Sequence, residues 1–140
     1  MKITRDKENQ ITTLSQAHYI DKILHRVGLQ DANPVSTPLD PNVNLETDEE
    51  ADQDKSGNDQ EVDHNRASGI YARAIGSLMY AAIGTRPDIA YAVHTLAKFT
   101  KSPQSKHWTA IKRIFRYLKG THDFCLTMSV TYIRWTRIHR

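Results

Sequence analysis

Few residues of this sequence have the type and spacing that metal binding or catalysis requires. His18 and His25 lie seven residues apart, on nearly the same face of a predicted helix. Two histidines without a further ligand make a poor metal site, so ordinary surface histidines are the favoured interpretation. Cys125 has no evident base near it in sequence, so a buried strand thiol is favoured over a nucleophile. Asp88 is most simply an acidic residue in the first turn of a helix.

An acidic stretch looks like the opening of a calcium-binding loop and then departs from that pattern. The run from Asp52 to Gly57 places Gly at the sixth position, as an EF-hand loop requires. Asp63 stands where the loop needs a bidentate Glu, and Lys55 adds a misplaced positive charge. A solvated linker is therefore favoured. No Gly-rich phosphate loop, HExxH motif or nucleophile elbow occurs, so the sequence predicts no catalytic residue, no metal ligand and no cofactor.

The strongest binding candidates are basic residues on a helix predicted over about 103–119. At 100° per residue, one side of this helix is apolar and the opposite side is basic. The apolar side holds Trp108, Ile111, Ile114, Phe115 and Leu118. The basic residues are Lys106, Lys112, Arg113, Arg116 and Lys119. No acidic residue is interleaved as an i,i+4 partner, which favours contact with an anion over a merely solvated face.

The charge of the chain is unevenly distributed. The net charge of +3 over 140 residues combines residues 46–63, with nine acids, one base and a formal charge of −8, and residues 66–140, which carry +11. A basic C-terminal half suggests a polyanionic partner, nucleic acid first, although a solvated cationic face is about equally favoured by composition. One cysteine, no membrane-spanning apolar run and no secretory signal predict an intracellular protein with no membrane partner.

The elements that would position these residues predict a mostly α, α+β fragment. Ile3 and the run 11–14 flank a polar turn and predict an N-terminal β-hairpin, which needs a larger sheet because two strands alone are barely stable. Residues 124–128 predict a short C-terminal strand, and the basic tail 132–140 has no clear period. The four predicted helices cover about 16–27, 67–83, 87–100 and 103–119.

The predicted helix boundaries rest on local signals. Ser15 is a plausible N-cap of the first helix, and Gly28 follows it where a left-handed residue is expected. Pro87 is expected at the first position of the third helix, and Ser102 as the N-cap of the fourth. Between the first two helices, three prolines force residues 33–41 into an extended path, and the acidic residues that follow predict a disordered loop.

Several separate strings in this sequence closely resemble the reverse transcriptase of copia-type retrotransposon polyproteins. They occur in the family's order and spacing over roughly residues 1–123, and upstream strings over 14–20 and 34–39 are similar to the same family. The matching residues include Tyr71, Arg73, Gly76, Ser77, Tyr80, Thr85, Arg86, Pro87, Asp88, His107 and Trp108.

The resemblance implies a place within that polymerase, from the end of the palm through a thumb-like helical bundle. It divides the chain into a palm-end hairpin over 1–15, a first thumb-like helix over 16–28, a Pro-rich and acidic flexible linker over 29–66, a three-helix thumb or connection region over 67–120, and a divergent tail over 121–140. The family's catalytic carboxylates lie upstream, and its ribonuclease H domain would follow Gly120, but the chain departs from the family at about Thr127.

The resemblance therefore predicts a truncated reverse-transcriptase fragment with no activity of its own. The intact polymerase would need magnesium, whereas the fragment would hold an RNA or DNA template–primer duplex through its basic helix. The rest of the reverse transcriptase is the second candidate partner. The alternative is a helical interaction or self-associating module, in which Trp108, Ile111, Phe115 and Leu118 lack a partner. A third possibility is that the reading frame is never usefully translated.

Overall fold

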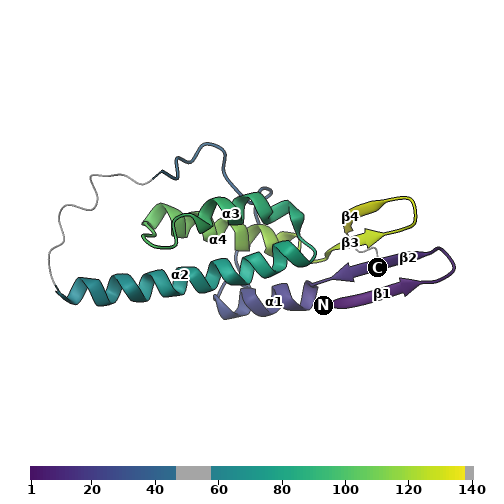
Figure 1. Cartoon of the computed structure of the whole chain (residues 1–140), viewed down its shortest axis with the longest axis horizontal. Coiled ribbons are helices and arrows are strands. Elements are labelled where there is room, and N and C mark those ends of the chain that lie inside the picture. The colour runs from purple at the N-terminus through teal and green to yellow at the C-terminus, as the bar shows by residue number, and fades with distance from the viewer. Residues whose placement is uncertain (47–57, 138–140) are drawn as a thin grey trace.

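The computed structural model describes residues 1–46 and 58–137, and the side chains of residues 58–65 are not described. Within these ranges, an elongated helical unit lies at one end and a β-sheet at the other (Figure 1). The elements in chain order are β1 (Lys2–Asp6), β2 (Ile11–Ser15), α1 (Ala17–Arg26), α2 (Asn58–Gly84), the 3-10 turn η2 (Pro87–Ile89), α3 (Ala90–Ala97), α4 (Ser105–Gly120), β3 (Phe124–Met128) and β4 (Ile133–Arg137).

The sheet joins the two ends of the described chain. Its strand order is β1-β2-β3-β4, and every neighbouring pair is antiparallel. The central pair is non-local, because Ser15 of β2 faces Cys125 of β3 and Thr12 faces Met128. The N-terminal hairpin is confirmed, and its expected support comes from the C-terminal strand of the same chain. Cys125 is buried on β3, as the sequence predicted.

The turn between β1 and β2 is held by one aspartate. The Asp6 carboxylate accepts hydrogen bonds from the backbone N–H groups of Glu8 and Asn9 at 3.1 and 3.2 Å, and from the Asn9 amide at 2.7 Å. These bonds, the Asn9 side-chain bond first, lower the pKa of Asp6 because they favour its charged form. The polar turn therefore fixes the hairpin register through local hydrogen bonds.

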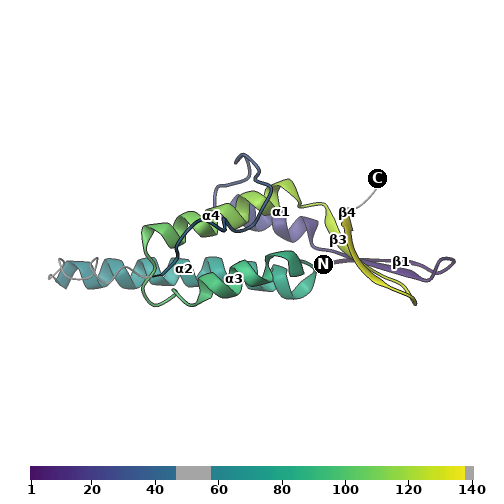
Figure 2. The same ribbon diagram turned by 90° about the horizontal axis from the view of Figure 1, so that it is seen from above.

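The helices form two layers around one hydrophobic core. Figure 2 shows α1 beside α4 in one layer and α2 beside α3 in the other. The buried side chains come from all four helices and from η2, and they include Ile20, Leu24, Leu78, Ile89, Leu96, Ile114 and Leu118. Leu118 is fully buried, so the apolar side predicted for the helix over about 103–119 does face the core. Trp108 of that side is half-exposed, and Ile70 on α2 is 49% exposed.

The four predicted helices exist, but their ends differ from the local signals. Gln16, not Ser15, occupies the N-cap position of α1, while Gly28 has the expected left-handed backbone with φ of 72°. Pro87 begins a 3-10 turn, and α3 starts only at Ala90. Gln104 replaces Ser102 as the N-cap of α4.

Two further predictions are corrected, and some lie outside the described residues. α2 begins at Asn58 rather than at about Ala67, so part of the expected linker is helical. The basic tail contains β4, because Ile133–Arg137 pairs with β3 along its whole length. The calcium-like run from Asp52 to Gly57 and the acidic loop around it lie within residues 47–57, which the structure does not describe.

Candidate nucleic-acid interface

The N-terminus of α4 is fixed by a buried histidine. The N–H of Gln104 donates to Nδ1 of His107 at 2.9 Å, and Nε2 of His107 lies 2.7 Å from the carbonyl oxygen of Leu45. These partners require the neutral tautomer with its proton on Nε2. The ring stacks on Phe99, with centroids 4.0 Å apart. His107 therefore joins α4 to the segment after α3 and to the end of residues 33–46, here called the Pro-rich segment.

The Pro-rich segment lies over part of the basic side of α4. Nη2 of Arg113 donates to Oγ1 of Thr37 at 2.7 Å, and Nε of Arg116 donates to the carbonyl of Asn33 at 2.8 Å. The Lys106 ammonium donates to the carbonyl of Glu46. Three of the five predicted binding residues are thus brought together, each tied to an extended segment that the sequence analysis treated as a linker.

A hollow of about 340 Å³ lies between this segment and α4. Its lining residues are Leu39, Asp40, Val43, Lys106, Thr109, Ala110, Arg113 and Arg116. Asp40 is the one acid among them, and its carboxylate accepts the backbone N–H of Asn42 at 2.9 Å. The Nε of Arg113 is buried without a hydrogen-bond partner. Three cations and one carboxylate among the described lining residues give the hollow a positive balance.

The other two predicted binding residues lie apart from this hollow. Lys112 is exposed and lines a different groove, between α2 and α4. Lys119 is half-buried near the end of α4, where Pro34 packs against Gly120. A Cβ on Gly120 would come within 2.9 Å of the Pro34 ring, so glycine permits this close approach. The basic side predicted as one surface is therefore divided by the overlying segment.

Arg86 and Asp88 of the family motif form a buried ion pair at the junction of helices and sheet. Nε and Nη2 of Arg86 donate to the two carboxylate oxygens of Asp88 at 3.1 and 2.8 Å. Nη1 and Nη2 also reach the carbonyl and hydroxyl of Thr121 at 2.8 and 2.5 Å. Asp88 is in the first turn of η2, as expected, but its carboxylate is committed to this pair.

Aromatic rings enclose the same arginine. The guanidinium carbon of Arg86 lies 5.7 Å from the ring centroids of Tyr117 and Phe124, and 5.2 Å from that of Trp135. Burial, followed by a hydrogen bond with Asp88, raises the pKa of Tyr117 to about 12. Because Phe124 and Trp135 belong to β3 and β4, Arg86 connects the helical core to the sheet.

The remaining motif residues divide between buried contacts and exposed positions. The Tyr71 hydroxyl donates to the carbonyl of Leu96 at 2.7 Å, and its ring meets Trp108 edge-on at 5.3 Å. Burial raises the pKa of Tyr71 to about 12. Oγ1 of Thr85 donates to Oε1 of Gln16 at 2.7 Å. The motif residues Tyr71, Thr85 and Trp108 therefore hold helices together, which is a structural role.

Around the middle of α2 the motif residues face outward. Tyr80 packs edge-on against Tyr19, with centroids 4.8 Å apart, and Ser77 accepts the Tyr19 hydroxyl on its carbonyl at 2.9 Å. Arg73 and Gly76 are exposed. The half-exposed tyrosine pair therefore fastens α1 to α2.

Sequence reasoning missed the residues that approach the basic side from outside α4. Asn33, Thr37 and Asp40 carry no motif and were assigned only to an extended path. Gln104 was missed because Ser102 and Pro103 gave a stronger local cap signal. No pattern in a single sequence marks the contacts of Asn33 and Thr37 with α4, since they join residues 83 and 76 positions apart.

The candidates for metal binding and catalysis do not gather into a site. His18 and His25 are exposed on α1. Within residues 1–46 and 58–137, no three His, Cys, Asp or Glu side chains come together to hold a metal ion. No helix in the same ranges is long and apolar enough to cross a bilayer.

Comparison with known proteins places most of the chain beside transposon polyproteins. It is 41% identical over 126 residues, 90% of the chain, to the retrovirus-related Pol polyprotein from transposon TNT 1-94 of Nicotiana tabacum. It is 42% identical over 108 residues, 77% of the chain, to the retrovirus-related Pol polyprotein from transposon RE1 of Arabidopsis thaliana. The aligned parts make up only 9% and 6% of those polyproteins, so the chain spans less than a tenth of their length.

A shorter protein also aligns with most of the chain. An uncharacterized mitochondrial protein of Arabidopsis thaliana is 32% identical over 108 residues, which cover 77% of the chain and 39% of that protein. No family model matches the chain. No solved structure matches it either. Two of these relatives are Pol polyproteins from transposons, which supports the coarser part of the expectation drawn from the sequence, a fragment of such a polyprotein.

Proposed function

We propose that this chain is a segment of a copia-type retrotransposon reverse transcriptase that holds a template–primer duplex and forms no bonds by itself. In this proposal β1 and β2 belong to the end of the palm, and α1 to α4 form a thumb-like clamp. The similarity to Pol polyproteins over 90% of the chain supports the origin. The family strings between Tyr71 and Gly120, which build the helical core, support the position within the polymerase.

The convergence of Lys106, Arg113 and Arg116 on one hollow carries the binding part of the proposal. Guanidinium groups bind phosphate oxygens through parallel N–H donors, and these two arginines each donate one hydrogen bond to the Pro-rich segment. A phosphate in the hollow would accept the unmatched Nε of Arg113. Such contacts are independent of base sequence, as a polymerase clamp requires.

The proposal assigns catalysis to other parts of the polyprotein. Nucleotide addition by two-metal polymerases needs convergent carboxylates that hold the divalent ions. The described residues do not fit magnesium in this way, because their carboxylates do not cluster and Asp88 is paired with Arg86. The chain would therefore position a duplex while the catalytic carboxylates act elsewhere.

Binding of an RNA–DNA hybrid duplex tests this function. We expect fluorescence anisotropy to show binding that weakens steeply between two salt concentrations, because bound phosphates release counterions. The double variant Arg113→Gln/Arg116→Gln should weaken binding by about tenfold or more. It should also reduce the slope of log affinity against log salt concentration by the amount expected for the loss of about two phosphate contacts.

The matched control is Arg5→Gln/Lys98→Gln, which removes two positive charges at exposed positions away from the hollow. Its affinity should stay within about twofold of the wild type, since neither residue lines the hollow. Equal losses in both double variants would mean diffuse attraction without a site. Primer extension by the purified chain with magnesium and nucleotides would contradict the assignment of catalysis to other segments.

The helical interaction module remains a separate candidate, but its original basis is wrong. Ile111, Phe115 and Leu118 were expected to lack partners, and all three are buried in the chain's own core. Only Trp108 of that set is half-exposed, and it packs on Tyr71. Any protein-binding surface that includes them must therefore also use more exposed apolar residues beside them, such as Val27 and Ile70.

A further inference from the structure

We infer that a groove between α1, α2 and α4 is a docking site for an acidic amphipathic helix. This inference goes beyond duplex binding and does not depend on it. The groove encloses about 530 Å³. Its floor and walls are formed mainly by Val27, Leu29, Ile70, Ala74, Trp108, Ile111 and Phe115. Arg26, Arg73 and Lys112 stand around it, and no carboxylate is among its described lining residues.

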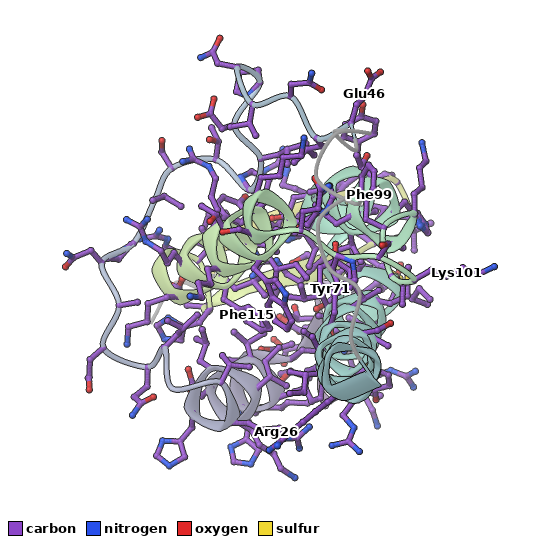
Figure 3. The ribbon with its side chains drawn as sticks, turned by 90° about the vertical axis from the view of Figure 1, so that its left-hand side faces the viewer. Arg26, Glu46, Tyr71, Phe99, Lys101 and Phe115 are labelled. Atoms are coloured by element: carbon purple, nitrogen blue, oxygen red, sulfur yellow. The ribbon has the colours of Figure 1, made fainter. Side chains whose placement is uncertain are left out.

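The groove exists because α1 is much shorter than the helix it packs against. α1 ends at Arg26 after 10 residues, whereas α2 has 27 residues. Figure 1 shows α1 beside only the C-terminal half of α2. Beyond the end of α1, the surface of α2 and α4 continues without a covering helix. Figure 3 views this end of the molecule along the helices, with Phe115 between α4 and α1.

The exposure of the walls favours a helix over a small enclosed ligand. Ile70 is 49% exposed and Val27 is 40% exposed, so the groove is open to solvent along its edge. A small molecule would leave these side chains wet, while a helix lying in the line of α1 would cover them. Apolar side chains at i, i+3 and i+4 of such a helix suit a groove between two helices.

The cations determine the charge of the partner. Each comes from a different helix, with Arg26 on α1, Arg73 on α2 and Lys112 on α4. Because the described lining residues include no acid, glutamates flanking the apolar stripe of a partner would be attracted and lysines repelled. A second copy of the chain, with +11 over residues 66–140 and −8 over residues 46–63, is the competing occupant that light scattering distinguishes below.

Three synthetic helical peptides of 14 residues test the inference. One has Leu and Phe on one face with flanking Glu, the second has Lys in place of Glu, and the third has Gln in place of Leu and Phe. In fluorescence anisotropy, only the acidic amphipathic peptide should bind well. The other two should bind at least about tenfold more weakly, because the basic peptide loses the charge attraction and the Gln peptide loses the apolar contact.

Variants of the protein locate the contact. Arg26→Glu/Arg73→Glu and, separately, Ile70→Gln should each weaken binding of the acidic peptide at least about fivefold, while Arg5→Glu/Lys98→Glu should change it less than about twofold. All these positions are exposed, so folding should persist, and far-UV circular dichroism checks it. The RNA–DNA hybrid serves as a second readout, because Arg26 and Arg73 lie outside the proposed duplex-binding set.

Other outcomes overturn the inference. Equal binding of the acidic and basic peptides, or equal losses in the groove and control variants, would leave no site. Displacement of the peptide by palmitate at a lower concentration than the peptide itself would identify a fatty-acid pocket instead. Light scattering that shows a dimer, lost in Ile70→Gln, would identify a second copy as the occupant.

Discussion

Arg86 at the helix–sheet junction and Arg113 on α4 place the same side chain in contrasting surroundings. Arg86 is fully buried, and its described donors meet Asp88 and Thr121 while three aromatic rings surround it. Arg113 donates one hydrogen bond, to Thr37, and its buried Nε has no partner. A cation whose donors are satisfied by its own fold serves the fold, whereas a cation with a donor left over can serve a ligand.

The largest expected effect comes from replacing Arg86, the arginine whose described donors are used by the fold. Arg86→Met should lower the free energy of unfolding by about 3–5 kcal/mol, because it leaves the carboxylate of Asp88, which is 13% exposed, without its cation. Urea denaturation of the two proteins measures this difference. The double variant Arg86→Met/Asp88→Leu should recover part of the loss, since no charge is then left buried. A single variant as stable as the wild type would remove Arg86 from its structural role.

A smaller loss of stability is expected when the pH rises, through buried tyrosines of the core, one of which faces Arg86. Tyr71 and Tyr117 have pKa values raised to about 12 by burial. The unfolded chain releases these protons near pH 10, and the folded chain keeps them, so stability is full below about pH 10 and falls between about pH 10 and pH 12. Urea midpoints across this range should decline, and the decline should be shallower in Tyr117→Phe. Ultraviolet titration that shows all six tyrosines ionising near pH 10 would contradict the two shifts.

Two glycine substitutions test how the Pro-rich segment packs against α4. Gly120→Ala should cost about 1 kcal/mol, because its Cβ would meet the Pro34 ring at 2.9 Å and push the Pro-rich segment away from α4. Gly76→Ala is the matched control, since nothing lies within 4 Å of a Cβ there, and it should stabilise α2 by about 0.5–1 kcal/mol. Thermal denaturation gives both signs, and two changes of the same sign would refute this packing of Pro34.

The smallest expected change in stability comes from the unsatisfied arginine. Arg113→Gln should alter the free energy of unfolding by less than about 1 kcal/mol, since one hydrogen bond is lost and one buried unpaired donor is removed. The same variant should still weaken duplex binding, so affinity and stability separate. A loss of stability as large as that of Arg86→Met would place Arg113 among the structural residues.

Local patterns predicted the helices and hairpin well, because each depends on neighbours in sequence. The apolar spacing in α4 placed Ile111, Ile114 and Leu118 in the core, where the structure has them. The strand Ile133–Arg137 was missed because its basic residues hide any alternation. The strand is stabilised by its pairing with β3 and by the contact of Trp135 with Arg86, and neither contact can be predicted from its local sequence.

The candidate site was predicted by residue but not by arrangement. The five cations of α4 follow from helical periodicity, yet the segment over them approaches from residues 33–46. Its contacts with α4 close loops of 60 residues or more, for which one sequence holds no local signal. The tertiary path of this segment therefore decided which cations share a hollow and which stand alone.

The pairing of β2 with β3 has a consequence for how the protein is made. Ser15 cannot meet Cys125 until the ribosome has synthesised the whole helical region between them. During translation the first hairpin must wait with an open hydrogen-bonding edge, and folding of the sheet becomes the last and slowest step. A nascent chain stalled before β3 would keep its helices but expose that edge to chaperones or to aggregation.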